Sequence, residues 1–232
     1  MTSGSTGLQA LSAGDIWAAE RPVWFGGVRL RSRMTVFRAG DGRLWVHSPA
    51  EPTAELCAEL DRLGEVAWII LPNRFHHLQA PAMKARYPRA LVVGPLSVKA
   101  RNGEVVLDRV IDDTELSALF PDFTSVALKG VPFLDETLFL HRKTGTLIGA
   151  DLMMCGCGAD HFTWRWASRL LGQYQKYRAP PDVRWNTKRT DEVRQSITEL
   201  AKLPIERILV AHSDPVEDRP VEELKEAWSF VV

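Results

Sequence analysis

The sequence predicts an α/β fold in which helices pack against β-sheet within one domain. Its 232 residues are 45% apolar, which is enough for one sizeable core. Strand-like segments dominate the first part of the chain, and later strands are mixed with amphipathic helices, a pattern typical of layered helix and sheet. No internal repeat or linker divides the chain, so residues 11–232 are expected to form a single domain. Residues 1–10 are expected to be frayed, because the chain starts with small polar residues.

Antiparallel strands open the predicted domain. Residues 15–20 form a short strand-like segment, and Gly26-Gly27 lies at the centre of a predicted hairpin turn region. Polar and apolar residues alternate over 33–38, which is the period of a half-buried strand. The following Asp41-Gly42 is a strong hairpin signal, so residues 44–47 are predicted to return as the partner strand.

A helix and a buried strand precede a loop that contains two histidines. Apolar residues recur at helical spacing after Thr53, and Gly64 is a suitable C-terminal cap for that helix. Residues 66–71 form a continuous apolar run, which predicts a strand covered on both faces. His76 and His77 follow shortly after its end, where an α/β protein would place a metal or a catalytic base.

The remaining elements are predicted from apolar periodicity and from the positions of Gly and Pro. In chain order they are a helix at 81–87, a strand at 90–94, a short strand at 104–107, an acidic helical turn at 112–116, strands at 124–128, 136–141 and 146–149, helices at 162–177 and 190–203, a strand at 205–210 and a closing helix at 221–230. The strands at 136–141 and 146–149 are expected to form a hairpin through Gly145.

Charge and cysteine usage exclude several classes of protein. Lys plus Arg and Asp plus Glu number 29 each, so nothing predicts a nucleic-acid partner, which would need a basic surface. No apolar run is long enough to span a bilayer, and the first residues do not form a secretory signal. The three cysteines, Cys57, Cys155 and Cys157, are too few for a disulfide framework. We therefore expect a cytoplasmic protein with neither a nucleic-acid nor a membrane partner.

Polar side chains with metal-binding chemistry follow three of the predicted strands. His76 and His77 follow the strand at 66–71, Asp151 follows 146–149, and His212 follows 205–210. Ligands collect at strand ends in α/β sheets, and imidazole and carboxylate groups suit zinc or iron. Such a metal activates bound water at neutral pH. The alternative is structural, because an Asp after a strand is often a turn or N-cap residue and such a histidine is often only hydrogen-bonded.

The order of these elements resembles the metallo-β-lactamase superfamily, and more closely a branch of it known only as a domain of unknown function. The resembling stretches are 15–17, 33–36, 45–49, 71–73 with His76-His77, 87–88, 146–148 with Asp151-Leu152, and His212. They span nearly the whole chain. The resemblance implies a four-layer αββα sandwich, in which two mixed sheets pack face to face with helices outside and the site lies at one edge of the sheets.

This chain departs from the superfamily at several ligand positions. The superfamily's first metal loop reads His-x-His-x-Asp-His, and its four ligands fall here on Pro72, Arg74, His76 and His77. A further histidine expected after the next strands falls near 130–132, where this chain has Gly-Val-Pro. The three absent histidines would make up one metal position of the dinuclear members, so that position is expected to be lost. The resemblance implies that the second position remains, with the ligands His76, His77, Asp151 and His212.

The resemblance implies a mononuclear metal-dependent hydrolase that binds one zinc or iron ion and acts on an ester, lactone, amide or phosphoester. Asp151 would act in catalysis as well as bind the metal. Arg74 would orient the substrate, because a guanidinium can bind an anionic group bidentately. The alternative is a non-catalytic member that binds a small molecule or a partner protein in the old cleft, since proline cannot bind a metal and the charge of Arg74 would oppose one. A weaker alternative is redox or metal sensing by Cys155 and Cys157.

Aromatic residues gather in one late segment. They are predicted to pack the helix at 162–177 onto the sheet, with a substrate cleft or a homodimer surface as alternatives, because interfaces are also rich in aromatic residues. They are Trp164, Trp166, Tyr174, Tyr177 and Trp185. Asp214 is predicted to cap a turn or helix, and the alternative is that it supports His212. His47 and His141 lie within predicted strands and are expected to be structural.

Overall fold

The computed structural model describes residues 7–12, 15–111 and 119–232. The chain divides into two compact units, of which the first comprises residues 1–21 and 32–111 and the second comprises residues 22–31 and 112–232. The single domain expected over 11–232 stays a prediction. The helical turn predicted at 112–116 lies outside the described residues.

The first unit is built on a mixed seven-stranded sheet whose strands follow the order β1 to β7. They are β1 (Gln9–Ser12), β2 (Ile16–Phe25), β3 (Val28–Arg38), β4 (Leu44–His47), β5 (Val66–Ile70), β6 (Leu91–Gly94) and β7 (Arg109–Val110). Strand β1 is antiparallel to β2 and β3 is antiparallel to β4, whereas β4 to β7 run parallel. Strand β1 begins inside the segment 1–10 that we expected to be frayed. The turn between β2 and β3 belongs to the second unit.

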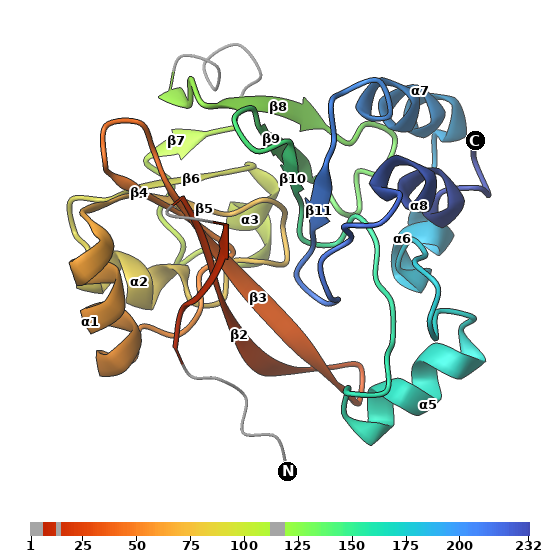
Figure 1. Ribbon diagram of the computed structural model, residues 1–232, viewed down its shortest axis with the longest axis horizontal. Coiled ribbons are helices and arrows are strands. Elements are labelled where there is room, and N and C mark those ends of the chain that lie inside the picture. The colour runs from red at the N-terminus through yellow and green to blue at the C-terminus, as the bar shows by residue number, and fades with distance from the viewer. Residues whose placement is uncertain (1–6, 13–14, 112–118) are drawn as a thin grey trace. The chain divides into compact units, whose positions relative to one another are not determined.

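The helix α1 (Ala54–Leu63) forms where the sequence predicts it. The side chain of Thr53 accepts a hydrogen bond from the Leu56 backbone N–H, which satisfies a donor that the first helical turn leaves free. Gly64 ends the helix at a close approach, since a Cβ there would lie 2.6 Å from the Gly42 carbonyl oxygen. Leu56 and Leu60 are fully buried in the core beneath the sheet. Figure 1 shows α1 and α2 (Ala80–Arg86) beside strands β4 to β6.

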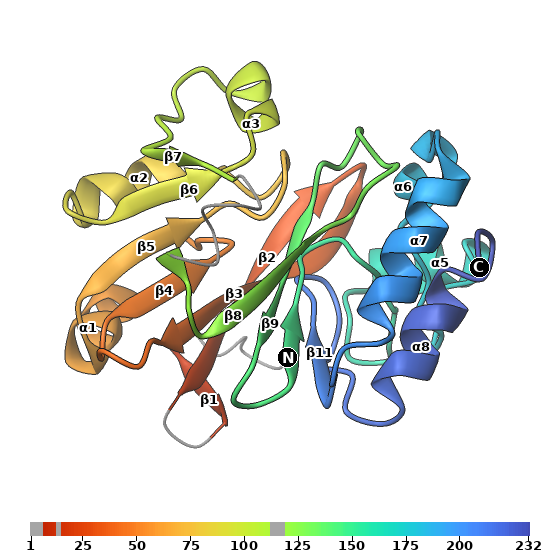
Figure 2. The same cartoon turned by 90° about the horizontal axis from the view of Figure 1, so that it is seen from above.

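The second unit contains a mixed four-stranded sheet in the order β11-β10-β9-β8. Its strands are β8 (Phe123–Ala127), β9 (Thr137–His141), β10 (Thr146–Ile148) and β11 (Arg207–Leu209). Strand β10 is antiparallel to β9 and parallel to β11, so the C-terminal ends of β10 and β11 lie next to each other. Its helices are α5 (Phe162–Leu170), α6 (Pro181–Asn186), α7 (Thr190–Leu200) and α8 (Pro220–Ala227). Figure 2 shows α6, α7 and α8 gathered beside this sheet.

Two predicted elements differ from the structure. The helix predicted at 162–177 ends at Leu170, because Gly172 adopts a positive φ of 69° and the following residues pair with the segment around Gly156. The strand predicted at 104–107 is wrong, since these residues follow a turn in which the Glu104 N–H donates to the side chain of Asn102. A short helix that we did not predict, α3 (Ser97–Arg101), precedes this turn. None of the helices in the described ranges has the length and apolarity that a bilayer crossing requires.

Candidate functional site

Asp151 and His212 come together at the end of the four-stranded sheet. They follow the parallel neighbours β10 and β11, whose C-terminal ends are adjacent. The Nε2 atom of His212 lies 3.3 Å from Oδ1 of Asp151, and both side chains are largely buried. These are two of the four metal ligands that the sequence predicts, and each offers one ligand atom at this place.

A hydrogen bond at Nδ1 of the His212 imidazole shows that this nitrogen carries a proton. Its Nδ1 lies 2.5 Å from the carbonyl oxygen of Arg31, and a carbonyl can only accept, so Nδ1 carries a proton and donates. If the ring is neutral, Nε2 directs a lone pair toward a carboxylate oxygen. A lone pair and a carboxylate oxygen repel each other at 3.3 Å. A positive charge removes this repulsion, either as a second proton on the ring or as a metal ion between the two groups. An imidazole that donates to a backbone carbonyl through one nitrogen is oriented as metal-binding histidines commonly are.

Glu136 holds the turn that carries Asp151. Its carboxylate is buried and accepts hydrogen bonds from the backbone N–H groups of Ala150 and Asp151, the latter at 3.1 Å and 3.2 Å to its two oxygens. One buried carboxylate accepts from two consecutive backbone N–H groups and so fixes the backbone at Asp151. The Cα–Cβ bond of Asp151 therefore points in a fixed direction. Sequence analysis did not identify Glu136 as a functional residue.

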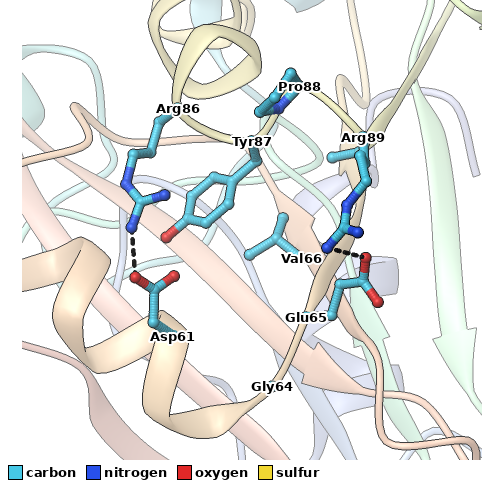
Figure 3. A pocket seen from close by; sticks show the side chains of 9 residues that line it. Asp61, Gly64, Glu65, Val66, Arg86, Tyr87, Pro88 and Arg89 are labelled. Atoms are coloured by element: carbon cyan, nitrogen blue, oxygen red, sulfur yellow. Dashed lines mark hydrogen bonds and ion pairs between the residues drawn. The ribbon is translucent and has the colours of Figure 1, made fainter.

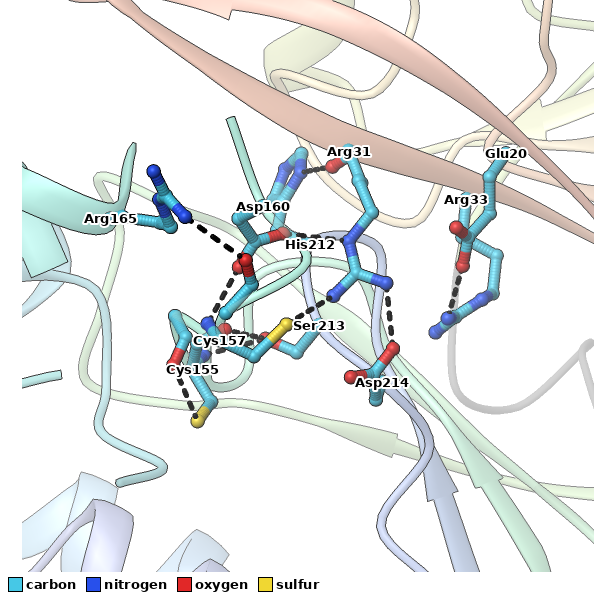
Figure 4. Close-up of polar contacts among 12 residues, drawn as sticks. Glu20, Arg31, Arg33, Cys155, Cys157, Asp160, Arg165, His212, Ser213 and Asp214 are labelled. Carbon is cyan, nitrogen blue, oxygen red and sulfur yellow. Dashed lines mark hydrogen bonds and ion pairs between the residues drawn. The ribbon is translucent and has the colours of Figure 1, made fainter. Parts of the chain in front are cut away.

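Arg31 is the centre of a polar network that positions the carbonyl under His212 (Figure 4). Its Nε lies 2.9 Å from Asp160 Oδ1, and its Nη1 lies 2.6 Å from Asp214 Oδ1. Its Nη2 contacts the sulfur of Cys157 at 3.7 Å. Asp214 is thus an ion-pair partner of Arg31, whose backbone carbonyl accepts from His212, and its predicted role as a cap stays a prediction.

The carboxylate of Asp182, at the start of α6, interacts electrostatically with both Asp151 and His212. Its pKa is raised, first by burial and then by the negative charge of Asp151, whereas His212 lowers it. A backbone hydrogen bond from Val183 partly offsets the cost of burying this carboxylate. The second unit therefore places two carboxylates and one imidazole together, and sequence analysis missed Asp182.

The loop with the two histidines is shaped by Asn73. The side chain of Asn73 is fully buried, and its Oδ1 accepts from the backbone N–H groups of Phe75 (2.9 Å) and His76 (3.1 Å). This turn carries the chain from β5 into α2 and leaves His76 half-exposed and His77 buried. Asn73 was noted in the sequence only as part of the family resemblance.

Burial and neighbouring charged groups lower the pKa values of two histidines in the first unit. The pKa of His77 is lowered by burial and by electrostatic interaction with Arg101 and His76, although a hydrogen bond that the ring donates to the Arg74 backbone carbonyl acts in the opposite direction. Burial also lowers the pKa of His47 to about 3, and His76 contributes to this shift. Both rings are therefore neutral at pH 7, and His77 Nδ1 has no hydrogen-bond partner among the residues that the structure covers.

Arg74 is half-buried and does not face the solvent freely. Its guanidinium carbon lies 5.9 Å from the centroid of the Phe75 ring, and that of Arg101 lies 4.5 Å from the same centroid. The Nε of Arg74 is buried and finds no hydrogen-bond partner within the described ranges. Arg74, His76 and His77 belong to the first unit, whereas Asp151 and His212 belong to the second. That all five form one site stays a prediction.

A separate surface pocket of about 440 Å³ lies in the first unit, between the ends of α1 and α2 (Figure 3). Two ion pairs line it, Arg86 with Asp61 and Arg89 with Glu65, the second at 3.2 Å. Their charges balance, and none of the predicted site residues lines this pocket. It is therefore not the site that the sequence predicts.

The comparisons with known proteins identify the fold. Residues 13–95 match the model of the family described as Domain of unknown function (DUF4336). A metallo-β-lactamase from Pontibacter korlensis superposes with a TM-score of 0.66 at 12% identity, covering 97% of both chains. The chain has the metallo-β-lactamase fold. A metallo-β-lactamase from Hirschia baltica superposes equally well, at 0.66 and 11% identity, over 97% of this chain and 96% of the other. The predicted α/β fold class is confirmed.

A third similar structure was determined with a metal. It is the metallo-β-lactamase FIM-1 from Pseudomonas aeruginosa in its mono-zinc form, with a TM-score of 0.65 at 10% identity over 96% of this chain and 94% of the other. At such low identity these likenesses establish the fold and not the activity. A search among curated proteins gave no match.

Proposed function

We propose that the protein is a mononuclear metal-dependent hydrolase whose metal is bound by His76, His77, Asp151 and His212. The observation that carries the proposal is the His212 imidazole, which donates through Nδ1 to a carbonyl and directs Nε2 at the Asp151 carboxylate. The donor set of three imidazoles and one carboxylate fits zinc or iron. The metallo-β-lactamase fold and its mono-zinc relative support the same kind of site. When bound, the metal supplies Lewis-acid chemistry.

The side chains of this chain have definable roles in such a reaction. His77 is suited to bind a metal because burial keeps its imidazole neutral, so a lone pair is available without the loss of a proton. Glu136 holds the backbone of Asp151, which we propose accepts a proton in catalysis, and Arg31 accepts a hydrogen bond from His212 that orients its ring. Arg74 would orient an anionic group of the substrate, which we propose is an ester, lactone, amide or phosphoester.

One observation favours the alternative, a non-catalytic protein that binds a small molecule or a protein partner. The guanidiniums of Arg74 and Arg101 both lie near the ring of Phe75, in the loop that would carry two metal ligands. Two fixed cations oppose a metal cation and attract an anion. In this alternative the His212 imidazole is protonated and forms an ion pair with Asp151.

Metal content separates the two functions. Protein purified without chelator should contain about one zinc or iron per chain by elemental analysis. His212→Ala and His77→Ala should lose it, whereas His161→Ala, which replaces a histidine at the start of α5, should retain it. Ester, lactone, amide and phosphoester substrates are then tested with and without a chelator. A metal-free protein whose thermal unfolding ignores both zinc and chelator would refute the hydrolase, and a metal-loaded protein inactive on all substrates would favour the binding role.

A further inference from the structure

The helix α5 exposes a stripe of large apolar side chains. Phe162, Trp166 and Leu170 are spaced four residues apart and so lie on one face of the helix. They are 57%, 68% and 86% exposed, respectively. The other face of α5 packs against the second unit, since Trp164 is buried against the hairpin residue Leu30. The exposed stripe is therefore not needed to hold α5 on the second unit.

The turn of the β2–β3 hairpin extends this stripe. Trp24 is 62% exposed and its ring meets that of His161 edge-on, with 5.8 Å between centroids. His161 in turn lies 4.5 Å from the ring of Phe162. The Arg29 backbone N–H donates to the side chain of Thr163 (3.0 Å), which fixes the hairpin to the helix. Figure 1 shows the end of this hairpin beside α5. We call Trp24, Phe162, Trp166 and Leu170 the aromatic surface.

The two chain segments that carry the aromatic surface hold basic residues and no acidic ones. Residues 22–31 and 161–178 contain no Asp or Glu, although the chain as a whole is neutral. Their basic residues are Arg29, Arg31, Arg165, Arg169, Lys176 and Arg178. Arg31 is paired with acidic groups from elsewhere, but in the described part of the chain Arg29, Arg169 and Lys176 form no ion pair and are exposed. The segments that carry the aromatic surface therefore present exposed basic side chains that no ion pair in the described residues neutralises.

We propose that the aromatic surface docks on an anionic lipid membrane. Exposed Trp, Phe and Leu next to basic residues are typical of elements that lie in the lipid headgroup region, where aromatic rings partition and anionic lipids attract Lys and Arg. This is peripheral binding by side chains, and it revises the expectation of no membrane partner, which the sequence supported only against a spanning segment. The proposal does not depend on the proposed hydrolase.

Other occupants fit the aromatic surface less well. A second copy of the chain would bring two positive surfaces together, which costs energy. Single-stranded nucleic acid stacks on aromatic rings, but the most exposed member of the stripe is Leu170, which offers no ring to a base. A lipid surface accepts Leu and Phe in its hydrocarbon and Trp at the headgroup level, so lipid explains the whole stripe.

Vesicle sedimentation with the full chain tests the proposal. The protein should sediment with phosphatidylcholine vesicles that contain phosphatidylserine and not with phosphatidylcholine alone. Trp166→Ala should weaken this binding on the order of tenfold, because a large ring no longer partitions. Lys176→Glu should weaken it at least about fivefold, because an attraction to anionic lipid is lost. The matched control is Trp185→Ala, which removes a tryptophan of similar exposure on α6 and should bind like the unmodified protein.

Several results would overturn the proposal. They are a failure to bind anionic vesicles, equal losses in Trp166→Ala and Trp185→Ala, and binding that ignores the lipid charge. Light scattering in solution compares the oligomeric state of the unmodified protein and of both variants. If the unmodified protein is a dimer that only Trp166→Ala dissociates, and it does not bind vesicles, the aromatic surface is a homodimer interface. Binding of single-stranded RNA in place of vesicles would contradict it too. Circular dichroism melts of each variant confirm that the exposed substitutions leave the fold intact.

Discussion

The burial of His47 predicts that stability falls in mild acid. This side chain is 1% exposed at the end of β4, and burial lowers its pKa to about 3, with the charge of His76 acting in the same direction. In the unfolded chain the pKa of histidine is about 6.5. Between these values the unfolded chain binds a proton that the folded protein does not bind. The free energy of unfolding therefore decreases as the pH falls below about 6.5.

The magnitude follows from the two pKa values. Between pH 7 and pH 5, protonation of the unfolded histidine changes its free energy by about 2 kcal/mol, while the folded ring stays neutral. The result depends little on the folded value, because any pKa below about 4 leaves the buried ring almost unprotonated at pH 5. His47→Gln removes this contribution, so the variant should lose about 2 kcal/mol less stability over the same interval.

Urea unfolding at pH 7 and pH 5 measures the effect in both proteins. The comparison uses the change with pH and not the absolute stability, because glutamine at a buried site carries a cost of its own at every pH. His77, whose pKa is also lowered, titrates in both proteins and cancels in the difference. Equal losses of stability in the unmodified protein and in His47→Gln would refute the reasoning.

Three further predictions concern the second unit and the proposed ion. Glu136→Ala should lower the free energy of unfolding by about 2–4 kcal/mol, because two buried backbone N–H groups lose their acceptor; in the same urea titration Glu136→Gln, which keeps one acceptor oxygen, should lose less. Burial and the neighbouring Cys157 raise the pKa of Cys155 to about 11, so at pH 8 iodoacetamide should modify Cys155 on the order of a hundredfold more slowly than in the unfolded chain, as followed by mass spectrometry; a fast reaction would support the redox alternative. By calorimetry, zinc binding should weaken about fivefold in Asp182→Asn, which removes a negative charge near the proposed ion. It should tighten by a similar factor in Arg74→Gln, which removes a positive charge. An unchanged zinc affinity in Arg74→Gln would show that Arg74 lies away from the ion.

The sequence predicts elements that depend on local chemistry. The helix α1 has a side-chain cap at Thr53 and a glycine where only glycine fits at position 64, so its two ends are specified by neighbouring residues. Strand β5 is predicted because a continuous apolar run places apolar side chains on both faces of a strand, and both faces must then be buried. The strand-end position of Asp151 and of His212 follows from the same reasoning, and their pairing follows from the parallel alignment of β10 and β11.

Residues that act through tertiary contacts carry no local signal. Arg31 lies in an alternating strand, where an arginine is ordinary, and its role arises from its backbone carbonyl under His212, 181 positions away in the chain. Glu136 stands at the start of a fully buried strand, and a carboxylate in that place could have been recognised as one that needs buried donors. In α5 aromatic residues occupy both faces, so periodicity alone cannot tell that Trp164 is buried and Trp166 is exposed.

The two units carry charges of opposite sign beside the proposed metal ligands. In the second unit the carboxylates of Asp151 and Asp182 repel each other, and His212 directs Nε2 at the same place, so a cation there lowers the energy. In the first unit the guanidiniums of Arg74 and Arg101 lie near the ring of Phe75 and favour an anion. In the proposed site a metal would be held chiefly by Asp151 and His212, and His77, whose pKa is lowered by burial, would add a neutral ligand. We propose that the place of the other metal position, which the family resemblance assigns to Pro72 and Arg74 in this chain, would then bind an anionic group of the substrate.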